Sequence, residues 1–202
     1  AKVDAVTSHA ELAKLWGELQ AERTGTPVVL FVGQDQKASD QYITLASQSG
    51  LGMPDRDYYL NSDEKSKEIQ QKYQAYITKV AELALWTDPA KVAATVYAIE
   101  TKLAEAQWSR IQNRDRNATY NKLSLAQLAE TAPGFDWAAL LGAAKLADVK
   151  EVVVRQPTYL TAFAKLQSEI SVADWQRHIL LYVRSKSLVC RYSPANNTLS
   201  FI

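Results

Sequence analysis

The chain has 202 residues, 47% of them hydrophobic and 22% charged, a composition typical of a globular protein large enough for one sizeable core. Its 23 basic and 22 acidic residues leave a formal net charge of +1, so we expect no nucleic acid and no anionic membrane surface as a partner. No apolar run is long enough for a membrane-spanning helix, and the first residues lack the basic and apolar blocks of a signal segment.

The beginning of the chain shows one helix signal and two strand signals. Ser8 and Glu11 have the spacing of a capping box, and apolar residues at helical spacing follow them. The runs 28–32 and 42–46 are rich in residues that favour strands, and a polar stretch separates them. We therefore expect a first helix and then a β-hairpin with a long loop.

Two long helices are expected next. Asn61, with an acidic residue three positions on, marks the start of a predicted helix over 62–86. Asp88 before Pro89 marks the start of another over 88–112, because a proline in the first turn has no N–H group to leave unpaired. Only one or two residues separate the two helices, so we expect them to pack antiparallel.

Shorter elements follow. The run 151–155 contains three consecutive valines and predicts a strand. Helix starts are predicted at Ser124, Asp136, Pro157 and Ser171. The predicted fold class is therefore mainly α, with a small β-hairpin near the N-terminus.

The helix from Ser171 carries five consecutive apolar residues at 179–183, so its apolar side chains project over more than one face. We expect it to present more apolar surface than this chain alone covers. Either the tail folds back over this surface with Leu199, Phe201 and Ile202, or a second copy of the chain covers it, and we favour self-association.

Residues for metal or nucleophilic chemistry are scarce. The two histidines, His9 and His178, form no HExxH pair, and Cys190 belongs to no pair spaced for zinc or redox chemistry. No GxSxG motif is present. The sequence therefore predicts no catalytic group, no metal ligand and no cofactor in this chain.

Two polar segments stand out as structural loops. In GLGMPDRDYYL, residues 50–60, Asp55 and Asp57 flank Arg56. Two buried carboxylates could act as an acid/base pair, but such a cluster more often pins a loop through charge-assisted hydrogen bonds to backbone amides. We therefore interpret this segment as an ordered loop.

The segment NRDRNATYN, residues 113–121, is predicted to be a turn that ties helices together, with Arg114, Asp115, Tyr120 and Asn121 as its candidate residues. Glu100 is expected to be tied to Arg114 or Arg116. The reason is that its neighbours on the third helix point inward, and an unpaired charge near a core is costly.

Taken together, these segments resemble the neprilysin and endothelin-converting-enzyme family of zinc metallopeptidases, especially its bacterial members. The resemblance covers roughly residues 1–185, in the family's order. The similar segments are LFVGQDQKASDQYI, SQSGLGMPDRDYYL, AIETKLAEAQWSR, NRDRNATYNKLSLAQL, PGFDW and VVVRQPTYL.

The resemblance implies a secreted, periplasmic or membrane-anchored zinc endopeptidase that acts on peptides. It also implies that residues 1–188 are part of the helical accessory domain and that the zinc ligands come from an HExxH helix and a later glutamate, downstream of this chain. Residues 189–202 depart from the family pattern and are expected to be a divergent tail. The implied partners are the catalytic domain and peptide substrates.

Met53 is the only methionine, so we expect the chain to be processed or cut from a longer protein. The leading hypothesis is a non-catalytic part of a peptidase that shapes the substrate chamber. The alternative is a self-standing helical binding protein that has lost the catalytic domain. A less favoured third hypothesis is an independent enzyme that uses Asp55, Asp57 or Asp115.

Overall fold

The computed structural model describes residues 2–189, 192–193 and 198–199, with side chains described as far as Val183. Of the chain, 53% is helical, and the described residues form eight α-helices and one four-stranded sheet, which confirms the predicted fold class. None of the helices in this part of the chain is long and apolar enough to cross a membrane. Cys190 and most of the expected tail lie outside the described residues.

The first half of the chain holds the β-hairpin of the sheet and the longest helix, α3. In order, it contains α1 (His9–Ala21), β1 (Val28–Gln34), β2 (Tyr42–Gln48), α2 (Asp57–Leu60), α3 (Glu64–Leu83) and α4 (Pro89–Ala106). The second half contains the 3₁₀ helix η1 (Gln112–Arg114), β3 (Asn121–Ser124), α5 (Leu125–Thr131), α6 (Trp137–Ala143), β4 (Glu151–Val154), α7 (Pro157–Glu169) and α8 (Val172–Val189). Two short strands, β5 (Tyr192–Ser193) and β6 (Thr198–Leu199), pair near the end.

The sheet has the strand order β1-β2-β4-β3. The predicted hairpin is confirmed: β1 and β2 are antiparallel, with Val28 opposite Gln48. The predicted valine strand is β4, which runs parallel to β2 and antiparallel to β3. Strand β3 was not predicted, because its sequence NKLS has little strand character and pairing with β4 supplies its structure.

Most helix starts are where the sequence places them. The capping boxes of Ser8 and Ser124 are both present, and Asp88 and Asp136 cap α4 and α6. The start of α3 differs by two residues, because its cap is Asp63, which accepts a hydrogen bond from the Ser66 amide at 3.0 Å.

The end of α4 lies at Ala106 rather than near residue 112. Ile111, expected on the apolar face of that helix, is 80% exposed. The chain leaves the helix at Gln107, whose backbone is extended and whose side chain donates to the Ser49 carbonyl at 2.8 Å. Bonds to the end of β2 thus replace the last turns of the expected helix.

The largest core cluster lies between the sheet and helices α1, α5, α6, α7 and α8. Trp16, Phe163 and Trp175 are fully buried at its centre, and the rings of Trp16 and Trp175 meet edge to face with centroids 5.2 Å apart. Such aromatic packing contributes both apolar burial and a preferred ring geometry. It fixes α1, α7 and α8 relative to one another.

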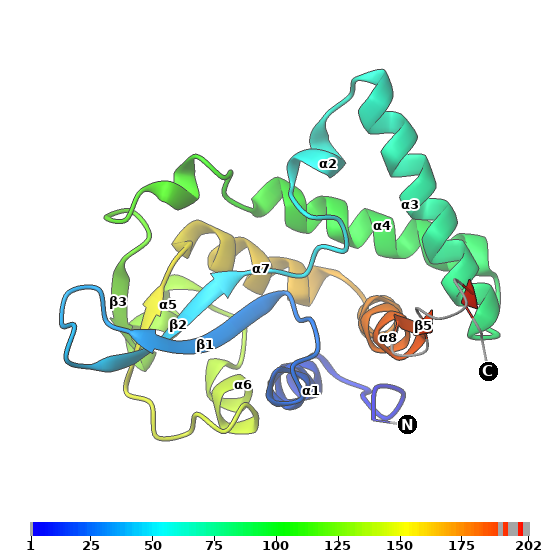
Figure 1. Cartoon of the computed structure of the whole chain (residues 1–202). Helices are drawn as coiled ribbons and strands as arrows, with labels where there is room; N and C mark the ends of the chain where they lie inside the picture. Colours follow the sequence, from blue (N-terminus) through cyan, green and yellow to red (C-terminus); the bar gives the residue numbers. More distant parts are fainter. Residues whose placement is uncertain (1, 190–191, 194–197, 200–202) are drawn as a thin grey trace.

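Helices α3 and α4 contact each other close to their short connection and then diverge like the arms of a V (Figure 1). The sequence predicted that the two helices pack antiparallel. In the structure they lie side by side only near their connection. The loop before α2 and α2 itself form a wedge between the arms: Met53 and Tyr59 pack with Tyr73 of α3 and Ala104 of α4. This apolar wedge is the physical reason for the opening.

The apolar run on α8 is covered within this chain. Ile179 and Leu181 are buried, and Leu180, Tyr182 and Val183 are half-buried against the core and against α3 and α4. The expectation that these five side chains present uncovered apolar surface is therefore wrong. Self-association remains a prediction, and these residues give it no support.

Candidate functional site

The loop 49–60 is held in shape by backbone conformation and by one tyrosine. Gly50 has φ +86°, and a Cβ at this position would lie 2.7 Å from Cα of Pro27, so glycine is required. The amides of Gly52 and Met53 both donate to the Tyr59 hydroxyl, at 3.1 and 2.9 Å. These two hydrogen bonds join the beginning of the loop to Tyr59 near its end.

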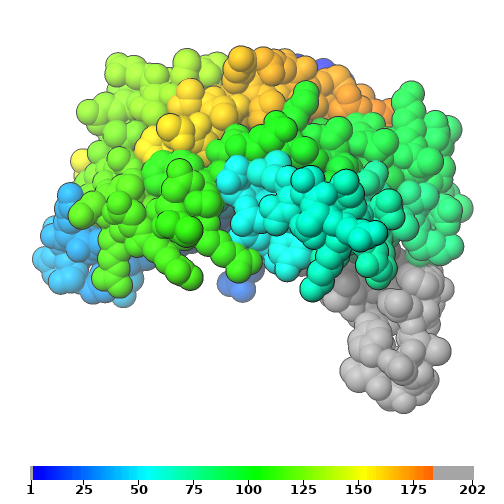
Figure 2. Space-filling model, turned by 90° about the horizontal axis from the view of Figure 1, so that it is seen from above, coloured from blue at the N-terminus to red at the C-terminus, as the bar shows by residue number. Residues whose placement is uncertain are grey.

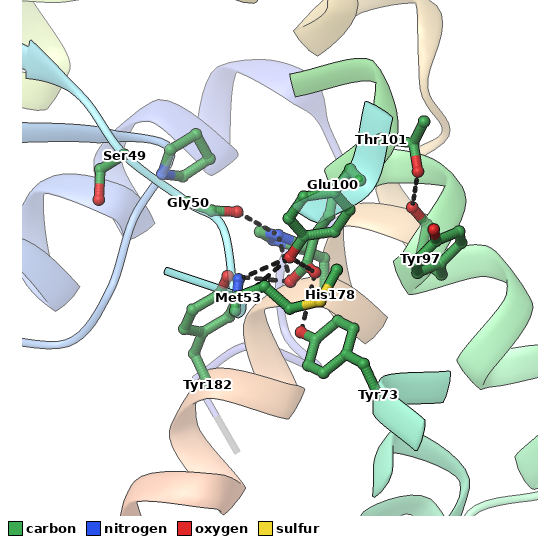
Figure 3. A network of polar contacts seen from close by, with 12 residues as sticks. Ser49, Gly50, Met53, Tyr73, Tyr97, Glu100, Thr101, His178 and Tyr182 are labelled. Atoms are coloured by element: carbon green, nitrogen blue, oxygen red, sulfur yellow. Dashed lines mark hydrogen bonds and ion pairs between the residues drawn. The ribbon is translucent and has the colours of Figure 1, made fainter. Parts of the chain in front are cut away.

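A buried carboxylate connects this loop to three helices. Glu100 of α4 is 0% exposed and accepts hydrogen bonds from the hydroxyls of Tyr59, Tyr73 and Tyr182, at 2.7, 2.8 and 2.9 Å (Figure 3). Nε2 of His178 lies 3.8 Å from the same carboxylate and 3.3 Å from the Gly50 carbonyl. We call these five residues the Glu100 cluster, which joins the loop, α3, α4 and α8.

Burial dominates the electrostatics of the Glu100 cluster. Desolvation raises the pKa of Glu100, and the tyrosine hydroxyls only partly oppose this because their hydrogen bonds favour the charged form. Burial and the nearby carboxylate raise the pKa of Tyr59, Tyr73 and Tyr182, so all three remain hydrogen-bond donors. Burial lowers the pKa of His178 to about 4, so its imidazole is neutral at neutral pH and the contact with Glu100 is not an ion pair.

The expected pairing of Glu100 with Arg114 or Arg116 is wrong. Among the described residues, its hydrogen-bond partners are the hydroxyls of the three tyrosines, and the only basic side chain within 4 Å is His178, which is neutral at neutral pH. Glu100 lies inside the core rather than at its boundary. Neutral hydroxyl donors satisfy a carboxylate there without the added cost of desolvating a guanidinium.

Of the two acids in the loop, Asp55 has both carboxylate oxygens hydrogen-bonded. Asp55 accepts from the Asp57 amide at 2.9 Å through one oxygen and from the Arg110 guanidinium through the other. Burial works to raise the pKa of Asp55, but the Asp57 amide and Arg110 outweigh it, so the pKa lies below its usual value. Arg56 donates from Nε to the Ala104 carbonyl at 3.0 Å, which ties the loop to the end of α4.

The turn 113–121 is organised around Asp115, whose Oδ1 accepts from the amides of Asn117 and Ala118 at 2.9 and 3.0 Å. The Asn121 side chain donates to the carbonyls of Ala118 and Val154, at 2.7 and 3.1 Å, and so attaches the turn to β4. Arg114 ends the short helix η1.

Tyr120 connects that turn to the hairpin. Its hydroxyl donates to Asp35 at 2.7 Å, and the Asp35 side chain is only 2% exposed. Asp35 also accepts from the Lys37 amide at 2.9 Å and lies 3.7 Å from Nζ of Lys122. We call Asp35, Lys37, Tyr120 and Lys122 the Asp35 cluster.

The candidate residues therefore form two separate groups, with Asp55, Arg56, Asp57 and Glu100 in or beside the loop and the others in the turn. The sequence analysis missed Tyr59, Tyr73, Tyr182 and Asp35. Of these four residues, only Tyr59 lies in one of the two polar segments that the sequence pointed to, the loop 50–60.

The described residues do not fit a zinc site. They contain no group of three or more histidine, cysteine, aspartate or glutamate side chains placed to hold a metal ion. Nε2 of His178 is turned toward the Gly50 carbonyl, and its Nδ1 is buried without a partner. A catalytic zinc site needs about three converging protein ligands.

Comparisons with known proteins identify the family of the chain. A sequence model described as "Peptidase family M13", covering the N-terminal part of that family, matches residues 1–193. Endothelin-converting enzyme 1 of Cavia porcellus is 30% identical over 151 residues, which are 71% of this chain and 20% of that protein. Neprilysin-3 of Drosophila melanogaster is 30% identical over 137 residues, 64% of this chain and 17% of that protein.

Solved structures show the same relationship. The zinc metalloprotease Zmp1 of Mycobacterium tuberculosis, in complex with an inhibitor, superposes with a TM-score of 0.83 at 30% identity. The superposition covers 98% of this chain and 33% of Zmp1, so the chain spans about a third of that relative and a fifth of endothelin-converting enzyme 1. The chain therefore belongs to peptidase family M13, the neprilysin-type zinc metallopeptidases, and corresponds to the N-terminal region of that family.

Proposed function

We propose that this chain is a non-catalytic, helical portion of a neprilysin-type zinc endopeptidase and that it shapes the chamber in which a peptide substrate meets the metal. One observation carries the proposal. The fold superposes on a third of a zinc metalloprotease, and the described residues contain no group of three or more histidine, cysteine, aspartate or glutamate side chains that could hold a metal ion. In this proposal, residues 1–188 are the accessory domain, 189–202 a divergent tail, and the catalytic domain and peptide substrates are the partners.

The packing supports a structural role. Asp55, Asp115 and Glu100 each accept hydrogen bonds from groups of this chain, so none of these three is left as a free general base. The same bonds join four separate elements around Glu100. A hydrogen-bond network such as the one around Glu100 makes the wall more rigid, as a chamber that selects substrates by size requires.

The experiment that tests this proposal is a chimera in which the chain replaces the superposed third of Zmp1. We expect the chimera to cleave a short fluorogenic peptide in a chelator-sensitive manner, with a changed preference for peptide length relative to Zmp1. The isolated chain, at the same concentration and with added zinc, is expected to show no cleavage.

Two results would count against the proposal. One is chelator-sensitive cleavage by the isolated chain with one zinc bound per molecule. The other is a chimera whose length preference equals that of Zmp1, which would mean that this region does not shape the chamber. A chimera that folds but cleaves nothing would favour the self-standing binding protein instead.

We also propose, on the basis of the family resemblance, that the enzyme is periplasmic, secreted or anchored to a membrane outside the cytoplasm. Fractionation of cells that express the full gene, with an antibody against this chain, tests that proposal. Recovery in the cytoplasm alone would contradict it.

A further inference from the structure

A polar pocket lies beside the loop 49–60, outside the Glu100 cluster. It is bounded by the end of β2, by the loop and by the segment that follows α4, and its volume is about 320 Å³. Figure 2 shows this part of the surface, with the loop lying against the residues that follow α4. The volume is at the lower end of the range of roughly 300–1,000 Å³ usual for small-ligand sites.

The side-chain amides in the pocket wall form hydrogen bonds that hold the wall in place. Gln48 forms two hydrogen bonds with the backbone of Trp108, accepting from N at 2.7 Å and donating to O at 2.9 Å. Asn113 donates to the same carbonyl and accepts from Gln156. Gln107 donates to the Ser49 carbonyl. These bonds preorganise the pocket, which lowers the entropic cost of binding.

Two residues that line the pocket have donor groups that form no hydrogen bond within the described part of the chain. Of the Arg56 guanidinium, only Nε is engaged among the described residues, and Arg56 forms no ion pair there. The hydroxyl of Ser49 has no hydrogen-bond partner among these residues. The neighbouring acid, Asp55, already has one oxygen on the Asp57 amide and the other on Arg110. The other neighbouring acid, Asp57, is exposed and does not line the pocket, so Arg56 is a pocket cation without an ion pair among the described residues.

We propose that this pocket binds a carboxylate group of a peptide, with Arg56 as its main ligand and Ser49 as a second donor. A guanidinium matches a carboxylate because it can donate two parallel hydrogen bonds. The choice of a peptide rests on the proposed function, whereas the carboxylate follows from the donors.

The test is an NMR titration of the isolated chain with N-acetyl-Phe-Ala, with its C-terminal amide and with an amidated peptide that carries one glutamate. We expect saturable shifts of the loop amides with the free acid and none with the neutral amide. The glutamate peptide shows whether a side-chain carboxylate binds as well as a C-terminal one. Inorganic phosphate serves as the competitor.

The variants are chosen to separate binding from folding. Arg56→Gln should weaken binding of the free acid by about tenfold, the expected effect of losing a charge-assisted bond. Ser49→Ala should weaken it by a smaller factor of about two to five. Arg116→Gln removes an exposed arginine elsewhere and should change nothing. Arg56→Lys keeps the charge and should retain part of the affinity, which guards against a folding defect in Arg56→Gln.

Three outcomes would overturn the inference: equal shifts with the acid and the amide, unchanged affinity in a folded Arg56→Gln variant, or complete displacement of the acid by phosphate at equal concentration. Because no cleavage is measured, a negative result here leaves the proposed function intact. An inactive chimera, in turn, would not affect this result.

Discussion

Glu100 and Asp35 are both almost fully buried carboxylates that join segments far apart in the chain, but their surroundings differ. Asp35 accepts from the backbone amide of Lys37 and from Tyr120, with Lys122 nearby, and these contacts lower its pKa. Glu100 has no cation within 4 Å among the described residues, since the nearby His178 is neutral, and burial raises its pKa despite three tyrosine hydroxyls. Hydroxyl donors alone thus hold a carboxylate in place without compensating for its desolvation.

The two carboxylates consequently have opposite effects on stability as the pH changes. The lowered pKa of Asp35 means that its contribution is present above the usual value of 3.8 and is lost as the pH falls through the folded-state value. The raised pKa of Glu100 means that the folded state takes up a proton more readily than the unfolded state. Its contribution is therefore greatest at low pH and falls as the pH rises from the usual value of 4.5 through the raised one.

The largest effect is expected for Glu100→Ala. The substitution leaves three hydroxyls without their acceptor and opens a cavity, so we expect a loss of about 3–5 kcal/mol in the free energy of unfolding. Urea titration measures it, and Glu105→Ala on the exposed side of the same helix is the control, with a change within about 0.5 kcal/mol. A loss below about 1 kcal/mol would mean that desolvation cancels the hydrogen bonds, and the cluster would not be a stabilising centre.

The histidine of the Glu100 cluster predicts acid sensitivity. The unfolded imidazole takes up a proton below its usual pKa of 6.5, whereas the buried one does so only near 4, so protons favour the unfolded state between these values. Acidification from pH 6.5 to 4 should therefore remove about 3 kcal/mol through His178. The measurement is the difference in unfolding free energy between the wild type and His178→Gln across this range.

His9→Gln, at a half-buried histidine bound to the Ile170 carbonyl, should retain that acid-dependent loss. A flat difference between the wild type and His178→Gln would show that the pKa of His178 is not lowered in the folded state, so that the imidazole is protonated below its usual pKa of 6.5. It would then form an ion pair with Glu100, and the contrast with the Asp35 cluster would disappear.

The sequence predicted the local structure well because the determining contacts are local. The capping boxes of Ser8 and Ser124 each involve residues three apart, so they can be seen in a short stretch of sequence. The burial of Glu100 could also be predicted, because its neighbours at helical spacing are apolar. Its partners could not, since the three tyrosines lie 41, 27 and 82 residues away.

The opening between α3 and α4 was missed for a related reason. Short connections favour antiparallel packing, and nothing in the two helices shows that another segment lies between them. The wedge comes from the loop before α2 and from α2, which appeared in the sequence only as an ordered loop. The pocket likewise depends on β2 meeting the end of α4, a contact that no local pattern reveals.

Gly52→Ala tests whether the loop and Tyr73 are as tightly placed as the Glu100 cluster requires. A Cβ at residue 52 would lie 1.8 Å from the Tyr73 hydroxyl, which is held by Glu100 at 2.8 Å. The rigid ring must move and weaken that bond, so we expect a loss of about 1–3 kcal/mol. Gly142→Ala, with open space around its Cβ in α6, should instead raise stability by up to about 1 kcal/mol, as helix propensity predicts. A Gly52→Ala variant with unchanged stability would indicate that the loop can move to make room for the methyl group.

The smallest effect is expected in the Asp35 cluster, for Tyr120→Phe. The substitution removes the bond to Asp35 but keeps the ring, over which Nζ of Lys37 lies 4.5 Å from the centroid. Asp35 retains the Lys37 amide and Lys122, so we expect a loss of only about 1 kcal/mol, close to that of a single hydrogen bond. Tyr42→Phe, at a tyrosine that is 81% exposed in the same hairpin, is the matched control and should change stability by less than about 0.5 kcal/mol. A loss in Tyr120→Phe as large as that in Glu100→Ala would show that the compensating amide and lysine contribute little. The two clusters would then depend equally on their tyrosines.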